Sequence, residues 1–136
     1  MKRAITLIAL IGTFSTGFSS YNNEAYLVKD APAMYGLHAT AYCLPGKTYT
    51  GKKVRRGICA TGRKEWLGMT ALIYQRLPNG DPGDLIGIYE IEDTGCSENV
   101  LDVWCEDLDS CQDFMDEVYK DGCQGKVFAQ IVDAKG

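Results

Sequence analysis

The most constraining feature of this sequence is the stretch from Glu92 to Trp104, which reads EDTGCSENVLDVW. Two segments typical of β-strands, Ile86 to Glu92 and Val100 to Trp104, flank a short polar loop. Asp93 directly follows the first segment, and Asp102 lies inside the second. Burying a carboxylate within an apolar strand costs free energy unless a partner compensates it. We therefore expect the chemistry of this chain around these two aspartates.

The N-terminus is typical of a secretory signal peptide. Met1 to Arg3 is a short basic start, and Ala4 to Phe14 is an apolar run. This run is shorter than the roughly 20 residues that a transmembrane helix needs, although an uncleaved anchor is the alternative. We predict a signal peptide over residues 1–20, a location outside the cell or in the cell wall, and no stable membrane insertion after cleavage.

The charge of the remaining chain limits its partners. Without Lys2 and Arg3 the 14 basic residues fall to 12, which against 18 acidic residues gives a net charge of −6. A nucleic-acid partner needs a basic surface, so none is predicted. The length suits one domain with its own core, which we place over residues 36–136 after a linker over residues 21–35.

The six cysteines all follow the predicted signal peptide. An even number in an exported chain predicts up to three disulfides, with 15 possible pairings. Proximity along the sequence favours Cys111–Cys123 and Cys96–Cys105, which leaves Cys43–Cys59. Zinc is the alternative, but the chain has no C-x-x-C pair and one histidine, His38. No metal site is therefore predicted.

Strand-forming segments recur along the chain. Strands are predicted over Leu37–Cys43, Met69–Gln75, Leu85–Glu92, Val100–Trp104 and Lys126–Val132. The turn-forming residues of 77–84 must reverse the chain. Residues 44–57 contain three glycines, a proline and five basic residues, which predicts a long exposed loop. This loop is either a solvated face or the lip of a cleft that contacts an anionic ligand.

One helix is predicted near the C-terminus. Asp109 suits an N-cap, with Gln112 at the capping-box spacing. An apolar stripe at helical spacing follows, and it consists of Cys111, Phe114, Met115, Val118 and Tyr119. Gly122 is a natural end for this helix. Many short strands with a single late helix predict a mainly β fold, and a small barrel rather than a parallel sheet with crossover helices.

The two aspartates allow two interpretations. Asp102 shares its strand face with Val100 and Trp104, so desolvation and an ionised Asp93 should raise the pKa of Asp102. A carboxyl group that keeps its proton near neutral pH can donate it to a leaving oxygen, as in glycoside chemistry. The structural alternative is that Asp93 caps a turn and Asp102 accepts hydrogen bonds from backbone amides.

Five short segments, in this order, resemble the 3D domain, a family named for three aspartates. They are TAYC from Thr40, ATG from Ala60, TALI from Thr70, EDTG from Glu92 and LDV from Leu101. The resemblance covers about residues 37–132. It implies a six-stranded double-psi β-barrel with one short helix near the C-terminus, related to the catalytic barrel of membrane-bound lytic transglycosylase A.

The same resemblance implies an activity on peptidoglycan. A lytic transglycosylase cleaves the β-1,4 bond between N-acetylmuramic acid and N-acetylglucosamine and leaves a 1,6-anhydro product. Asp102 would be the acid/base, and Asp93 would orient the sugar or adjust the pKa of Asp102. The expected substrate-binding residues are Thr40, Tyr42, Tyr74, Thr94 and Trp104. The expected partner of this monomeric protein is peptidoglycan or a related glycan, and no cofactor is implied.

The sequence departs from the family pattern at two positions. Tyr74 stands where the first family aspartate is expected, and Cys96 replaces the second glycine after Asp93-Thr94-Gly95. A non-catalytic domain that binds the cell wall is therefore the main alternative to an enzyme. Asp-Thr-Gly also occurs in retroviral-type aspartic proteases, but Glu92 and Cys96 do not fit the flanking residues of those enzymes. A small secreted effector or inhibitor with a barwin-like or expansin-like barrel is the third alternative.

Overall fold

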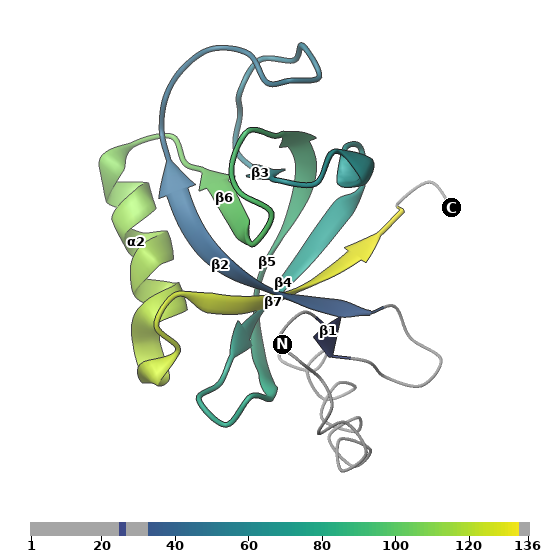
Figure 1. Cartoon of the computed structure of the whole chain (residues 1–136). Helices are drawn as coiled ribbons and strands as arrows, with labels where there is room; N and C mark the ends of the chain where they lie inside the picture. Colours follow the sequence, from purple (N-terminus) through teal and green to yellow (C-terminus); the bar gives the residue numbers. More distant parts are fainter. Residues whose placement is uncertain (1–24, 27–32, 134–136) are drawn as a thin grey trace.

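The computed structural model describes residues 25–26 and 33–133 of the chain (Figure 1). The predicted signal peptide, residues 1–20, lies outside these residues. The elements in chain order are β1 (Ala25–Tyr26), β2 (Met34–Tyr42), β3 (Ile58–Thr61), η2 (Lys64–Trp66), β4 (Thr70–Arg76), β5 (Pro82–Asp93), β6 (Val100–Trp104), α2 (Leu108–Tyr119), η3 (Lys120–Gly122) and β7 (Lys126–Val132). The predicted mainly β class with one late helix is confirmed.

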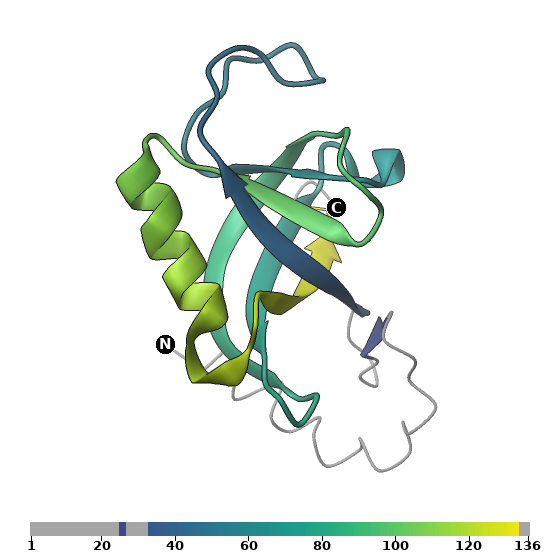
Figure 2. The same ribbon diagram turned by 60° about the vertical axis from the view of Figure 1, so that its left-hand side comes forward.

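The strands form one sheet in which six of them close into a ring. The strand order is β1-β2-β6-β3-β5-β4-β7, and an additional pairing between β2 and β7 closes the ring, with β1 on the outer edge of β2. Two pairs are parallel, β2 with β6 and β3 with β5, and the other pairs are antiparallel. In Figure 2, β2 and β6 run side by side across the front of the ring. The strand that carries Asp102 therefore lies between β2 and β3.

The observed strands agree with the predicted ones to different degrees. The predicted bounds of β6 and β7 are confirmed at both ends. β2 begins at Met34, inside the predicted linker, and β5 begins at Pro82, inside the predicted turn. β3 was not predicted as a strand. Its four residues are all buried, so they carry none of the alternation of polar and apolar residues by which a short strand is recognised.

The helix α2 begins slightly earlier than predicted. Its N-cap is Asp107, whose carboxylate accepts a hydrogen bond from the Ser110 amide at 2.8 Å. The predicted N-cap Asp109 is wrong, because the helix already begins at Leu108. Gln112 hydrogen-bonds Asp116 instead of forming a capping box. The helix lies along β2 (Figure 1). Of the predicted stripe, Phe114 and Val118 are buried, whereas Tyr119 is 49% exposed.

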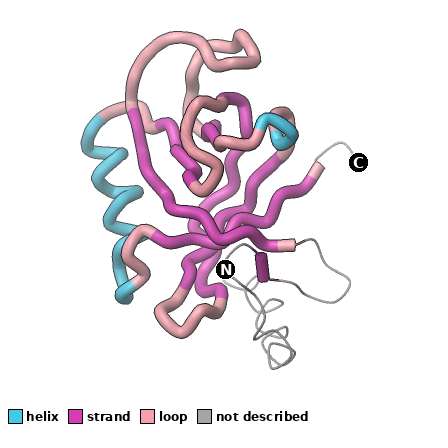
Figure 3. The backbone as a smooth tube through the Cα atoms, in the orientation of Figure 1, coloured by secondary structure: helices cyan, strands magenta, loops and turns pink. Residues whose placement is uncertain are grey.

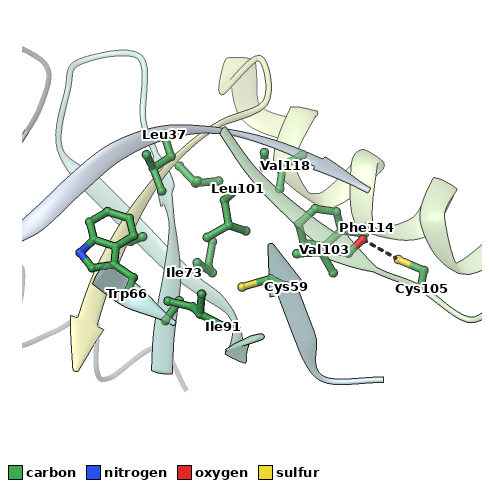
Figure 4. Close-up of a cluster of buried hydrophobic side chains, with 14 residues drawn as sticks. Leu37, Cys59, Trp66, Ile73, Ile91, Leu101, Val103, Cys105, Phe114 and Val118 are labelled. Atoms are coloured by element: carbon green, nitrogen blue, oxygen red, sulfur yellow. Dashed lines mark hydrogen bonds between the residues drawn. The ribbon is translucent and has the colours of Figure 1, made fainter. Parts of the chain in front are cut away.

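The core fills the inside of the ring. Buried side chains from the strands meet those of α2 there, and ten of them are labelled in Figure 4: Leu37, Cys59, Trp66, Ile73, Ile91, Leu101, Val103, Cys105, Phe114 and Val118. Leu101 and Val103 of β6 point inward and are at most 2% exposed. Since side chains alternate across a strand, Asp102 points to the outer face. The inward packing of Leu101 and Val103 therefore places the Asp102 side chain on the outer face of the ring.

Candidate functional site

The site is built on the outer face of β2, β6 and β3. Asp102 lies opposite Thr40 in the parallel register of β2 and β6, and opposite Ala60 in the antiparallel register of β6 and β3. The Thr40 hydroxyl donates a hydrogen bond of 2.7 Å to Asp102 Oδ1. Ala60, opposite Asp102 on the β3 side, is buried. Pairing of β2 with β6 thus joins two predicted site residues that are 62 positions apart.

The carboxyl group of Asp102 is partly buried, and its pKa is raised. Desolvation is the largest cause, the negative charge of Asp93 acts in the same direction, and the hydrogen bond from Thr40 opposes both. The direction agrees with the sequence prediction. The structural alternative for Asp102 required bonds from backbone amides, whereas its hydrogen bond comes from a side-chain hydroxyl. Asp102 therefore retains the features of a general acid.

Asp93 lies at the end of β5, and in the parallel register of β3 and β5 it is also opposite Ala60. The two aspartates thus flank one alanine of β3. Asp93 Oδ1 accepts hydrogen bonds from the Thr94 amide at 2.9 Å and from the Tyr49 amide at 3.0 Å. Gly95 follows with φ +114°, a conformation that favours glycine. The structural interpretation, in which Asp93 braces a turn, therefore holds for this residue.

Tyr42 places a buried hydroxyl group beside the two aspartates. The hydroxyl oxygen is inaccessible to solvent and has no hydrogen-bond partner among the described residues. Burial raises the pKa of Tyr42, and the negative charges of Asp93 and Asp102 raise it further. The hydroxyl interacts with Asp93, but not in the geometry of a regular hydrogen bond. The hydroxyl is therefore neutral and closed to solvent, and Tyr42 forms part of the surroundings of the two aspartates.

The loop between β2 and β3, predicted over residues 44–57, covers residues 43–57 and extends beyond the ends of these strands at the top of Figure 3. The Trp104 indole Nε1 donates a hydrogen bond of 2.8 Å to the Leu44 carbonyl, at the start of the loop. The Tyr49 amide binds Asp93, and the Thr50 amide donates to the Glu92 carbonyl at 3.4 Å. Trp104 and Asp93 thus hold the loop at two points. The loop therefore forms a lip beside the aspartates.

Glu92 is a structural residue of the site that the sequence analysis did not single out. It is buried, yet its carboxylate receives both terminal nitrogens of Arg55, with Nη1 at 2.9 Å. Lys52 lies 3.7 Å away, and Arg55 also binds Glu90 at 2.9 Å. The pairing with Arg55 holds the pKa of Glu92 below its usual value. The sequence signal was present: an acid beside a buried isoleucine on a strand, in a chain with a strongly basic loop.

The loop's basic residues are therefore largely occupied inside the molecule. Arg55 and Lys52 form ion pairs with Glu92, and Arg56 pairs with Glu106 at 3.4 Å. These three side chains neutralise the protein's own acids, whereas Lys47 and Lys53 are exposed. Two of the five basic residues of the loop are therefore presented to solvent.

The structure does not bring Tyr74 to the aspartates. Tyr74 is 2% exposed, in β4, and its β5 partner is Leu85. Leu85 precedes Asp93 by eight positions along β5, or roughly 26 Å of strand. Tyr74 therefore cannot contact a glycan bound at Asp102, and its place among the substrate-binding residues is corrected. Thr94, by contrast, is next to Asp93 and partly exposed.

A cavity of about 240 Å³ lies on the other side of Trp104, between the end of β6 and α2. Its walls include Trp104, Tyr89 and Phe114, with Arg56 and Glu106 near the opening. Neither aspartate lines it. The outer face that carries Asp102 and this cavity are therefore separate features that share Trp104.

All six cysteines are free thiols in the structure, so none of the three predicted disulfides is present. The predicted pairing of Cys96 with Cys105 also disagrees with their surroundings. Among the other cysteines, Cys96 has the largest influence on the pKa of Cys59, and Cys111 has the largest influence on the pKa of Cys105. Proximity in sequence is a poor guide here because strand pairing, not chain order, decides which thiols meet.

Two further properties of the described residues bear on the site. Residues 25–26 and 33–133 contain no group of three or more His, Cys, Asp or Glu side chains arranged to hold a metal ion. In the same part of the chain, every helix is too short or too polar to cross a membrane. Comparisons of the chain with protein-family models, with curated proteins and with solved structures find no match in any of the three.

Proposed function

We propose that this protein is a secreted lytic transglycosylase that acts on peptidoglycan, with Asp102 as its acid/base. The observation that carries the proposal is the position of the Asp102 carboxyl group. It lies on the outer face of the ring, its pKa is raised, and Asp93 stands on the other side of Ala60. A carboxyl group of raised pKa beside a second acid is the arrangement that glycosidic cleavage requires.

The proposed reaction uses one carboxyl group twice. Asp102 donates its proton to the oxygen that links the two sugars, while the bond from that oxygen to C1 of N-acetylmuramic acid breaks. The Asp102 carboxylate then takes the proton from the 6-hydroxyl of the same muramic acid as its oxygen bonds to C1. The products are a 1,6-anhydro sugar and a free 4-hydroxyl, and Asp102 is protonated again. No water is consumed.

The surrounding residues have separate tasks in this proposal. Thr40 holds the Asp102 carboxyl group in place through its hydrogen bond, and Asp93 adds negative charge that favours the protonated form. Tyr42 lies beside both aspartates, and their negative charges help to keep its hydroxyl neutral. Trp104 and Asp93 fix the loop of residues 43–57, which forms one wall of the glycan path.

The closed ring supports a finer assignment of the fold. A double-psi β-barrel needs six strands in a closed sheet with parallel pairs among antiparallel ones. The ring of β2, β6, β3, β5, β4 and β7 has two parallel pairs, β2 with β6 and β3 with β5. This pattern, together with the five sequence segments that resemble the 3D domain, is the basis for proposing that barrel.

A second candidate function is non-catalytic binding of a cell-wall glycan. Two observations favour it. Tyr74 occupies the position of the first family aspartate and is buried away from the pair. In addition, one oxygen of Asp93 is already occupied by two backbone amides. A site with one available carboxyl group, where the family has three, is better suited to holding a sugar than to cleaving it.

The test is digestion of purified peptidoglycan by the mature protein, with mass spectrometry of the released muropeptides. We expect 1,6-anhydro products from the wild type and from Asp113→Asn, an exposed control on α2. Asp102→Asn should release none. If no variant releases product while the wild type still sediments with the insoluble wall, the binding function replaces the enzymatic one. If the wild type neither cleaves nor binds the wall, both are wrong.

A further inference from the structure

Three cysteines meet at one corner of the ring, where β2 and β6 end. The parallel register of these strands runs to Tyr42 opposite Trp104. The Cys105 amide then donates a hydrogen bond of 2.8 Å to the Tyr42 carbonyl. This bond continues the pairing by one step, so Cys43 and Cys105 are neighbours across the two strands. Cys105 is 7% exposed, and Cys43 is partly exposed.

The third cysteine comes from the helix. Cys111 lies on the same stripe of α2 as Phe114 and Val118, the two residues that α2 buries, and it packs against the core cluster. The helix lies along β2. Cys111 therefore faces the ends of β2 and β6 from above. The surroundings of the Cys111 thiol include the thiols of both Cys105 and Cys43, while the Cys105 thiol donates a weak hydrogen bond of 3.9 Å to the Val103 carbonyl.

The remaining cysteines are not part of this group. Cys96 has Cys59 as its neighbour, and Cys123 is buried after the last turn of α2. The three thiols at the corner do not form a metal site in the described residues. Three neighbouring thiols that bind no metal have a simpler chemistry. Any two can join, and the third can displace one of them.

We infer that Cys43, Cys105 and Cys111 form a thiol–disulfide exchange site in which Cys111 bonds alternately to Cys105 and to Cys43. The oxidant is a small-molecule disulfide. The Cys111 thiolate attacks one sulfur of the oxidant, forms a mixed disulfide and releases a thiol. Cys105 then attacks the Cys111 sulfur and releases the second thiol. Two electrons and two protons pass from the protein to the oxidant.

The exchange step needs no further reactant. The Cys43 thiolate attacks the Cys111 sulfur, the bond between Cys111 and Cys105 breaks, and Cys105 takes up the proton that Cys43 lost. Burial raises the pKa of Cys105 to about 12, which makes it a poor leaving group. Displacement of Cys105 and attack by Cys105 are therefore both slow, and the two disulfide forms should be separable. This inference does not rest on the proposed activity on peptidoglycan.

The two forms tie the helix to different strands. A bond from Cys111 to Cys105 holds α2 to β6, directly after Trp104. A bond from Cys111 to Cys43 holds α2 to β2, directly before Leu44 and the loop that stands over the aspartates. Which disulfide is present therefore decides whether α2 is bonded to the residue that precedes the loop.

The test is disulfide mapping of the full mature chain after equilibration with reduced and oxidised glutathione. Cleavage at acidic residues separates Cys105 from Cys111, because Glu106, Asp107 and Asp109 lie between them. We expect Cys111 in both linkages in the wild type. Cys43→Ser should leave only the bond to Cys105, and Cys105→Ser only the bond to Cys43. Cys123→Ser is the matched control and should change neither linkage.

Exchange itself is tested after glutathione is removed. A single linked form, isolated at pH 4, should convert at pH 8 into a mixture of the two forms and stay unchanged at pH 4, because only a thiolate attacks. The inference is overturned if Cys111 stays free in the glutathione buffer, or if it joins Cys96 or Cys123. It is also overturned if Cys111 is linked to one partner in the wild type and that linkage fails to shift in the serine variants. Far-UV circular dichroism of each variant shows whether it has folded.

Discussion

The Thr40 hydroxyl donates a hydrogen bond of 2.7 Å to Asp102 Oδ1 across the parallel pair of β2 and β6. This bond favours the charged carboxylate, whereas burial and the charge of Asp93 favour the protonated acid. The proton affinity of Asp102 is therefore a balance of opposing effects, each of which belongs to a residue that can be changed separately.

Replacing Thr40 should move this balance in one direction. In Thr40→Val the hydrogen bond to the carboxylate is lost, so the pKa of Asp102 should rise above its wild-type value. At neutral pH the free energy of unfolding should fall by about 1 kcal/mol. The carboxyl carbon of Asp102, followed by NMR through a pH titration, measures the first effect. Thr70→Val, on β4, is the control, and an unchanged Asp102 titration in Thr40→Val would contradict the prediction.

The raised pKa of Asp102 also predicts how stability depends on pH. A carboxyl group whose pKa is higher in the folded than in the unfolded chain stabilises the fold at low pH, and this contribution is lost as pH rises through the folded-state pKa. Asp102→Asn removes the dependence. The variant should therefore gain stability relative to the wild type as pH rises, which urea unfolding at several pH values measures. Asp113→Asn should show no such trend.

The sequence predicted those parts of the fold that depend on local pattern. The strand Val100–Trp104 and the strand Lys126–Val132 were predicted with their observed bounds, since each is an apolar run between polar turns. Phe114 and Val118 were placed on the buried face of a helix by their spacing. β3 escaped detection because four consecutive buried residues have no periodicity. Local patterns reveal elements, but not which elements become neighbours.

The site shows the same limit more clearly. Asp102 and Asp93 were identified because acids at strands are costly, but the partner of Asp102 is fixed by pairing across 62 positions. Tyr74 was assigned to the site from its place in a family pattern, and the register of β4 with β5 puts it far along the strand from Asp93. The role of Arg55 depends on a loop conformation that no local rule predicts. Long-range pairing is the part that sequence reasoning lacked.

The contact between Arg55 and Glu92 should stabilise the loop of residues 43–57. We expect a double-mutant cycle of Arg55→Met and Glu92→Gln to give a coupling free energy of about 1 to 3 kcal/mol. Because the pKa of Glu92 is lowered in the folded chain, this contribution is present above the unfolded-state pKa and is lost as pH falls through the folded-state value. Urea unfolding of the four proteins at neutral and acidic pH measures both. Additive effects of the two substitutions at neutral pH would contradict the prediction.

The Tyr42 hydroxyl should contribute neither to stability nor to ligand binding. It is buried without a hydrogen-bond partner, so Tyr42→Phe removes an uncompensated polar group. The free energy of unfolding should stay unchanged or rise by up to about 1 kcal/mol. Binding to insoluble peptidoglycan should stay unchanged, because the hydroxyl oxygen is closed to solvent.

These two measurements separate a ligand contact from a structural one. Tyr119→Phe, at an exposed position on α2, is the matched control and should alter neither quantity. A loss of stability in Tyr42→Phe would mean that the hydroxyl is already paired within the fold, with Asp93 as the nearest acceptor. Binding that weakens by roughly threefold to tenfold in a fully stable variant, the equivalent of one neutral hydrogen bond, would contradict the prediction and place a ligand atom at the hydroxyl.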